Sequence, residues 1–173
     1  MGNHEDSFAL HICSATLCCR ACEGAEREVR VAAERAVVTT MQLRTNAKAR
    51  VLIVEDESLL SMVVEDALTY EGYEVVGTAR TEPEAVSLAV AHTPDLVLMD
   101  IRLADNSDGI AAAAQILKRT GIRCLMATAF TDDKTKARAA PVQPLGWLAK
   151  PYDQEDMVQA VAEALQRARA AVA

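Results

Sequence analysis

Apolar segments of strand length alternate with segments of helical periodicity from Arg50 to the end of the chain. The strand-like segments are VLIV (51–54), EVVGT (74–78), DLVLMD (95–100), RCLMAT (123–128) and GWLAK (146–150). After the first of them, residues at i, i+3, i+4, i+7 and i+8 predict a helix whose buried face is Leu60, Val63, Val64, Ala67 and Leu68. Continuous apolar runs are typical of parallel strands that are covered on both faces. The alternation therefore predicts an α/β fold with a parallel sheet of five strands and helices on both faces.

Local signals mark the ends of the other helices. Thr81 stands three residues ahead of Glu84, which is the spacing of a capping box, and Pro83 lies in the first turn. Gly121 is placed to end the third helix. Residues 131–140, TDDKTKARAA, have almost no large apolar side chain to bury. We therefore expect this fourth helix to be the least stable one and the easiest to move.

The chain has 173 residues, of which 51% are hydrophobic. That length supports one well-buried domain and an appendage, so we assign residues 50–173 to the domain and residues 1–49 to an N-terminal extension. Residues 23–38 have helix-forming composition, whereas residues 39–50 are polar, and we predict an extension that is flexible or partly helical. A second interpretation is that translation begins at Met41. Finding the preceding residues intact in native protein by N-terminal sequencing would exclude it.

The formal charge of −7 lies entirely in residues 50–173, because basic and acidic residues balance before them. An acidic chain is a poor non-specific binder of nucleic acid or of anionic membranes. No apolar run approaches the length of about 18 residues that a membrane span needs. Acidic residues, in place of basic ones, precede the apolar N-terminal stretch, which argues against a secretory signal. We therefore predict a cytoplasmic protein that binds neither nucleic acid nor membranes.

The cysteines fall into two groups. Those of the extension lie close together, and Cys19 and Cys22 among them have CxxC spacing with His11 nearby. The second ligand pair that structural zinc motifs usually show is missing, so no metal site is expected there. Cys124 lies in a predicted strand, where a free cysteine ordinarily acts as a small buried hydrophobic residue.

Charged or hydroxyl residues stand at the ends of the first, third, fourth and fifth predicted strands. In chain order they are Glu55 and Asp56, then Asp100, Thr128 and Lys150. In a doubly wound, flavodoxin-like sheet of order 2-1-3-4-5, the first and third strands are neighbours, and ligands bind at their carboxyl ends. Each of these residues has an ordinary structural role when it is taken alone. Their common position at one rim of the sheet favours a single functional site.

This set of residues is suited to phosphate chemistry with a metal ion. Two carboxylates about 4 Å apart repel each other by roughly 4 kcal/mol near a protein surface, so they need water or a cation close by. Mg²⁺ binds one or two carboxylates together with phosphate oxygens, and Lys150 and Thr128 are placed to contact the remaining phosphate oxygens. With the repulsion relieved, Asp100 can act as a nucleophile toward phosphorus.

The segments EDE, LVLMD, MATAF and LAKPY together resemble the receiver domain of bacterial two-component response regulators. The resemblance covers residues 50–173. It implies that Asp100 is the phosphoacceptor and takes a phosphoryl group reversibly from the phosphohistidine of a histidine kinase. It also implies a Mg²⁺ ion held by the acid pair Glu55 and Asp56. Asp56 and Asp100 would be direct ligands, and the backbone carbonyl of Arg102 would be the third protein ligand.

The same resemblance gives roles to residues at the fourth and fifth strands. Thr128 would match the switch hydroxyl that moves toward the phosphoryl group, and Trp147 the aromatic residue that is coupled to it. Lys150 would complete the catalytic set with Asp100 and Thr128. The Lys150–Pro151 bond would match one that is cis in the family, against about 5–6% of X-Pro bonds in general.

The resemblance further implies a signalling function. Because the chain ends soon after the last predicted helix, we expect a single-domain regulator, not an enzyme beyond its own phosphorylation and dephosphorylation, that signals through protein contacts. Its partners would be a sensor histidine kinase or a histidine phosphotransfer protein, and an unidentified downstream protein; a homodimer is left open. A phosphoryl relay or sink is an alternative. A phosphohydrolase with an aspartyl nucleophile fits less well, because Arg102 stands where a second acid is usual, and a flavin binder would need a Ser/Thr/Gly loop where EDES stands.

Two segments depart from the pattern of the family. The loop IRLADNSDG after the third strand reaches Gly109 one residue later than the commoner form, and it has Ala104 where a proline is frequent. The segment APVQPLG (140–146) is unusual before the fifth strand, where receivers commonly bind partners or dimerise. These differences concern the shapes of loops more than the chemistry of Asp100.

Phe130, two residues beyond Thr128, would flank the phosphoryl group. We predict that its bulk restricts the approach of water and prolongs the phosphorylated state. Phe130→Ala should therefore speed hydrolysis, measured as the decay of purified phosphoprotein with time. An unchanged rate would count against this role.

Overall fold

The computed structural model describes residues 49–129 and 132–171. Its sheet has the strands β1 (Arg50–Val54), β2 (Glu74–Ala79), β3 (Leu96–Asp100), β4 (Cys124–Thr128) and β5 (Gly146–Ala149). They lie in the order β2-β1-β3-β4-β5, and all neighbouring pairs are parallel. The predicted α/β fold with strand order 2-1-3-4-5 is therefore confirmed. The predictions for the N-terminal extension and for Phe130 concern residues outside the described ranges.

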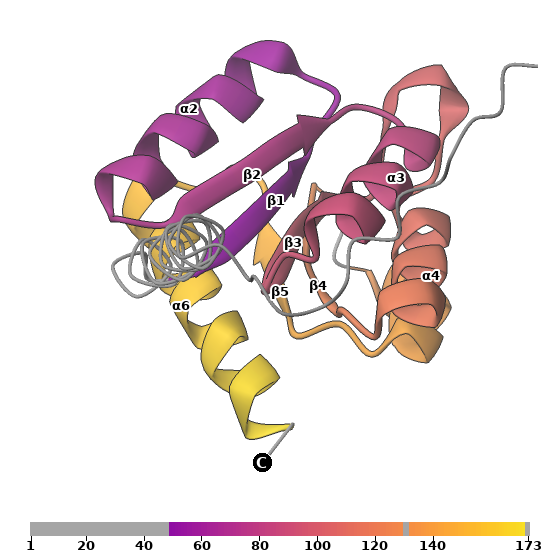
Figure 1. Cartoon of the computed structure of the whole chain (residues 1–173). Helices are drawn as coiled ribbons and strands as arrows, with labels where there is room; N and C mark the ends of the chain where they lie inside the picture. Colours follow the sequence, from indigo (N-terminus) through magenta and orange to yellow (C-terminus); the bar gives the residue numbers. More distant parts are fainter. Residues whose placement is uncertain (1–48, 130–131, 172–173) are drawn as a thin grey trace, which may run out of the picture. The chain divides into compact units, whose positions relative to one another are not determined.

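Helices cover both faces of the sheet. The α-helices of the described residues are α2 (Ser58–Tyr70), α3 (Glu82–His92), α4 (Gly109–Thr120), α5 (Asp133–Ala139) and α6 (Gln154–Ala170), and the short 3₁₀ helices are η1 (Ala104–Asn106) and η2 (Ala140–Val142). Figure 1 shows α2 and α6 on one side of the sheet and α3 and α4 on the other. None of the helices in the described part of the chain combines the length and the apolar character needed to cross a bilayer.

The side chains of alternate strand residues pack into two separate hydrophobic cores, one on each face of the sheet. In β1, Val51 and Ile53 pack toward α2 and α6, whereas Leu52 and Val54 pack toward α3 and α4. This is the side-chain alternation of a strand that is covered on both faces. Cys124 lies in the second of these cores, and burial raises the pKa of its thiol to about 12. It behaves as the small buried hydrophobic residue that its place in the sequence predicts.

One part of the predicted core is wrong. Val63 was expected on the buried face of α2, but 62% of it is exposed, and Ser61 is buried instead. Only part of the apolar side of α2 is buried, and this part is centred on Val64, Ala67 and Leu68. The reason is that the sheet and α6 cover only one side of this helix.

The predicted helix signals are present. The side chain of Thr81 accepts a hydrogen bond of 3.5 Å from the amide of Glu84, and Gly121 ends α4 with a φ of 76°. Helix α5 buries only Ala139, in agreement with its few apolar side chains. Few buried contacts make such a helix the easiest to displace.

Candidate functional site

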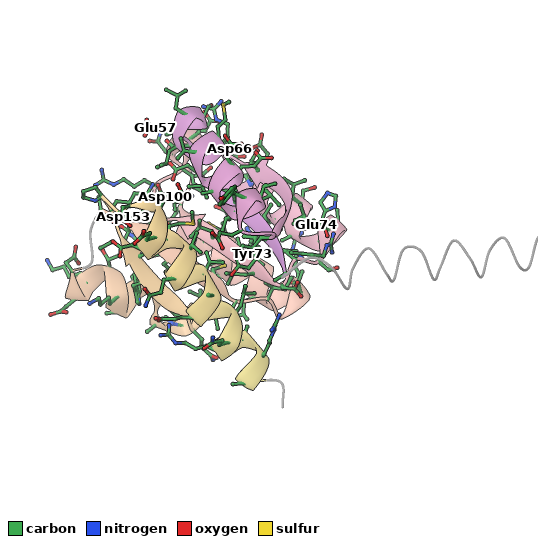
Figure 2. All side chains as sticks on the ribbon, turned by 90° about the vertical axis from the view of Figure 1, so that its left-hand side faces the viewer. Glu57, Asp66, Tyr73, Glu74, Asp100 and Asp153 are labelled. Carbon is green, nitrogen blue, oxygen red and sulfur yellow. The ribbon has the colours of Figure 1, made fainter. Side chains whose placement is uncertain are left out.

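Sheet register brings the carboxyl ends of four strands together. Val54 of β1 lies opposite Met99 of β3, and Asp100 lies opposite Ala127 of β4. The last residue of β4, Thr128, lies opposite Ala149 at the end of β5. In Figure 2, Asp100 lies away from Tyr73 and from Glu74, the first residue of β2. The residues that follow these strands therefore share one rim of the sheet.

Three carboxylates meet at this rim. Glu55, Asp56 and Asp100 each offer an oxygen atom, and these atoms all lie within 4.8 Å of one another. Glu55 and Asp100 are buried, whereas Asp56 is only half-buried and leaves the group open to solvent on its side. Two oxygen ligands of one Mg²⁺ ion lie up to about 4 Å apart, so this group of hard oxygen donors fits that ion after a small adjustment.

Lys150 lies between two of these carboxylates. Its Nζ atom is 2.5 Å from Oε2 of Glu55 and 2.5 Å from Oδ2 of Asp100. Burial, the largest single effect, would lower the pKa of Lys150, but the hydrogen bonds to the two carboxylates and the attraction of their charges together outweigh burial and raise this pKa above its ordinary value. Burial raises the pKa of Glu55 more than the contact with Lys150 lowers it. The site thus holds three acids and one cation, and an excess of negative charge.

Backbone amides bind the carboxylate oxygens of Glu55 and Asp100 that do not contact Lys150. The amide of Glu57 donates to Oε1 of Glu55 at 3.3 Å, and the amide of Arg102 donates to Oδ1 of Asp100 at 3.0 Å. Arg102 was predicted to contribute its backbone carbonyl to a metal ion. The structure places its backbone directly beside Asp100, and the metal-binding role of its carbonyl stays a prediction.

Thr128 and Trp147 lie on the same face of the sheet. Trp147 pairs in register with Met126, which lies two residues before Thr128 and therefore points to the same side. Thr128 is buried, and its carbonyl accepts a hydrogen bond of 2.8 Å from the amide of Lys150. Trp147 is half-buried against the core under α3 and α4. The Lys150–Pro151 bond is cis, as the resemblance to receiver domains implies.

Gly109 contributes to the site in a way that sequence reasoning missed. A Cβ atom built on it would lie 1.9 Å from the backbone oxygen of Asp100. Its amide donates to the carbonyl of Ile101 at 2.9 Å, so α4 begins directly against the strand end that carries Asp100. The sequence showed a glycine at the end of the loop, but only the tertiary structure shows which backbone comes so close to it.

Lys150→Met is expected to lower the free energy of unfolding by about 2 kcal/mol, because it leaves two largely buried carboxylates without their cation. Loss of one partner of a fully enclosed pair costs roughly 3–5 kcal/mol, and solvent beside Asp56 reduces this value. Because the pKa of Lys150 is raised, its contribution is complete at neutral pH and is lost only as the pH rises through that raised pKa. Urea unfolding measures the effect, with Lys118→Met on the exposed side of α4 as the control. Equal losses in the two variants would contradict the expectation.

Comparison with known proteins identifies the family of this fold. A family model of the response regulator receiver domain matches residues 51–162. The transcriptional regulatory protein PdtaR of Mycobacterium tuberculosis is 40% identical over 120 residues, which are 69% of this chain and 58% of PdtaR. The chemotaxis protein CheY of Bacillus subtilis is 31% identical over 117 residues, which are 67% of this chain and 97% of CheY.

Solved structures show the same fold. The signal receiver domain of a modulated diguanylate cyclase from Desulfovibrio desulfuricans superimposes with a TM-score of 0.64 at 32% identity, over 70% of this chain and 97% of that one. The chain spans 58% of the length of PdtaR and 46% of that of the regulator PhyR of Methylorubrum extorquens. The likeness therefore concerns the receiver part of these relatives. By sequence and by structure, the chain belongs to the response regulator receiver domain family.

Proposed function

We propose that this receiver domain is switched by transfer of a phosphoryl group from a phosphohistidine to Asp100. Receiver domains are phosphorylation-dependent signalling domains, and the proposal names the acceptor, the donor and the metal ion. The observation that carries it is the meeting of Asp100 with two further carboxylates and with Lys150 at one rim of the sheet. Such a group has little structural purpose, because three acids around one cation repel each other.

The transfer forms one bond and breaks one. A carboxylate oxygen of Asp100 bonds to phosphorus, and the bond between phosphorus and the histidine nitrogen breaks, with its electron pair going to the imidazole. The Arg102 amide and Lys150 hold the two oxygens of Asp100, which fixes the direction in which the carboxylate points. The positive charge of Lys150 would also stabilise the negatively charged oxygens of an incoming phosphoryl group.

Asp56 and Asp100 would hold Mg²⁺ directly, with Glu55 beside them and the carbonyl of Arg102 as a further ligand. When it is bound, the ion neutralises charge on the phosphoryl oxygens during transfer. Glu55 already contacts Lys150 and the amide of Glu57. Its carboxylate would therefore keep these contacts and add negative charge beside the ion. The half-buried position of Asp56 leaves a path from solvent to the site.

Acetyl phosphate tests the proposal without a kinase. The purified protein is incubated with it in Mg²⁺ or in an excess of chelator, and the intact mass is measured. We expect the mass of one phosphoryl group to be added in Mg²⁺ and not in chelator. No addition in either buffer would overturn the proposal, and continuous release of phosphate would favour a phosphohydrolase instead.

Helix α2 carries an apolar surface that suits docking of the donor protein. Of the five large apolar side chains that are exposed in the described part of the chain, four belong to α2. They are Leu59, Met62, Val63 and Tyr70, hereafter the α2 face. The face begins directly after the acidic loop, because α2 starts at Ser58. A helix that carries a phosphohistidine could lie on it with its imidazole near Asp100.

Met62→Lys is expected to slow transfer from a phosphohistidine donor about tenfold or more, because a charge replaces a central apolar contact of the α2 face. Transfer from acetyl phosphate should not change, since Met62 does not touch the acidic site. The comparison uses a histidine kinase or phosphotransfer protein that phosphorylates the wild type. Val90→Lys is the matched control, because Val90 is also an exposed apolar residue but lies on α3. Equal slowing by both variants would remove the α2 face from the proposal.

We further propose that the signal leaves through Thr128, Trp147 and α5. Helix α5 is tied to the loop after β3 by an ion pair of 3.1 Å between Arg138 and Asp108. A hollow of about 550 Å³ separates the two segments and is lined by Arg102 and Asp132 among others. A phosphoryl group on Asp100 that draws in the Thr128 hydroxyl would change the packing beside Trp147 and shift this weakly held helix. Passing the phosphoryl group to another histidine-containing protein is the alternative output.

A further inference from the structure

Ala79 at the end of β2 and the following Arg80 are hydrogen-bonded to the loop that carries Glu55 and Asp56 and to the loop that follows Asp100. The carbonyl of Ala79 accepts a hydrogen bond of 2.9 Å from the amide of Glu55. The next residue, Arg80, donates from its side-chain Nε to the carbonyl of Asp56 at 3.2 Å. The carbonyl of Arg80 also accepts a bond of 3.0 Å from the amide of Ala104, in the loop that follows Asp100.

The backbone of Arg80 is fixed by the first turn of α3. Its amide donates to Oε2 of Glu84 at 2.9 Å, and the amide of Glu84 donates to the side chain of Thr81. Helix α3 is anchored in the core by Ala85, Val86 and Ala89. The side chain of Arg80 is exposed, so it adds little to the core. What it does contact is the peptide group of Asp56.

We propose that Arg80 is a positioning residue of the phosphoryl-transfer site, whose Nε hydrogen bond holds the Asp56 peptide so that its carboxylate stays beside Asp100. The inference rests on the proposed function. Asp56 needs such support more than its neighbours do, because Glu55 and Asp100 are each held by Lys150 and by an amide. Within the described part of the chain, the carboxylate of Asp56 makes no hydrogen bond or ion pair with Lys150 or with a backbone amide.

The positive charge of Arg80 and its hydrogen bond to Asp56 should have opposite effects on the affinity of the site for Mg²⁺. The guanidinium is a cation close to the acidic group, so its charge alone opposes binding of Mg²⁺. The hydrogen bond, in contrast, favours Mg²⁺ by fixing the loop that carries Asp56. Removing the side chain therefore weakens Mg²⁺ binding if positioning dominates, and strengthens it if charge dominates.

Two substitutions separate these effects. In Arg80→Gln, the amide nitrogen is the same number of bonds from Cα as Nε of arginine, so the donor is kept and the charge is lost. In Arg80→Met, a side chain of similar length has neither donor nor charge. The two variants thus differ in the hydrogen bond to the Asp56 carbonyl and share the loss of charge.

The experiment titrates the metal-free proteins with Mg²⁺ and follows the amide resonances of residues 55–57 and 100–102 by NMR. We expect Arg80→Met to bind Mg²⁺ about tenfold more weakly than the wild type, the lower end of the effects seen for residues that support metal ligands. Arg80→Gln should bind as tightly as the wild type or more tightly. Equal affinities of the two variants would overturn the inference.

Amide hydrogen exchange in the metal-free proteins tests the same contact without any ligand. Exchange at Glu55 and Glu57 should be faster in Arg80→Met than in the wild type, and unchanged in Arg80→Gln. Unchanged exchange in both variants would show that Arg80 holds nothing, whatever the Mg²⁺ titration gives. A wild type that binds no Mg²⁺ would overturn the proposed function, and the exchange rates would still decide the role of Arg80 in positioning the loop.

Discussion

Asp100→Asn is expected to abolish uptake of a phosphoryl group from acetyl phosphate in the presence of Mg²⁺. An amide is a far weaker nucleophile than a carboxylate, and the substitution also removes one of the three acids that would hold the ion. The measurement is the intact mass of the variant beside that of the wild type. Asp66→Asn on the exposed side of α2 is the matched control and should be phosphorylated like the wild type.

The loss in Asp100→Asn should not come from unfolding. Removal of one carboxylate from a group of three relieves repulsion, so the variant should be at least as stable as the wild type in metal-free buffer. Urea unfolding checks this expectation. Phosphorylation of Asp100→Asn at the wild-type extent would show that the acceptor is another residue, and the proposed function would then be wrong.

Gly109→Ala is expected to destabilise the protein by roughly 3 kcal/mol and to remove most of the phosphorylation, because overpacking against backbone leaves no flexible atom to yield. The added Cβ atom would lie 1.9 Å from the backbone oxygen of Asp100 and 3.0 Å from Cα of Ile101. Either α4 or the end of β3 must move, and both hold the phosphoacceptor in place. Urea unfolding and the intact mass after treatment with acetyl phosphate measure the two effects.

Gly72→Ala separates the two effects of the Gly109 substitution. Gly72 has a φ of 85°, and no atom lies within 4 Å of an added Cβ. This variant should lose about 1–2 kcal/mol through backbone strain alone. Its phosphorylation should be retained, because the turn after α2 is far from the acidic site. If Gly109→Ala is phosphorylated like Gly72→Ala, the close contact at Asp100 has no role in the chemistry.

Local patterns in the sequence were sufficient for the alternation of strands and helices and for the four charged side chains that meet at the rim of the sheet. Apolar runs and helical periodicity depend on short-range order, and the handedness of crossovers leaves few ways to connect parallel strands. The polar residues at four strand ends could be found for the same reason, since the carboxyl ends of parallel strands share one rim. The cis bond before Pro151 was predicted from the resemblance to receiver domains.

Contacts between distant segments could not be read from the sequence. Nothing in the local pattern shows that Lys150 lies between Glu55 and Asp100, 95 and 50 residues away in the chain. Val63 continues an apolar pattern, yet it is exposed because no element within residues 49–129 and 132–171 packs on that side of α2. Arg80 has no local feature that sets it apart from a surface arginine.

The sequence by itself determined the alternation of strands and helices and which side chains stand at the strand ends, because both follow from the period of the pattern; the strand order came from the assignment to a doubly wound, flavodoxin-like sheet. Only the tertiary structure decided which of these groups touch, which face of α2 the other described elements cover, and where a methyl group has no room. These properties depend on distances between segments far apart in the chain, and such distances are set by the packing of the whole domain.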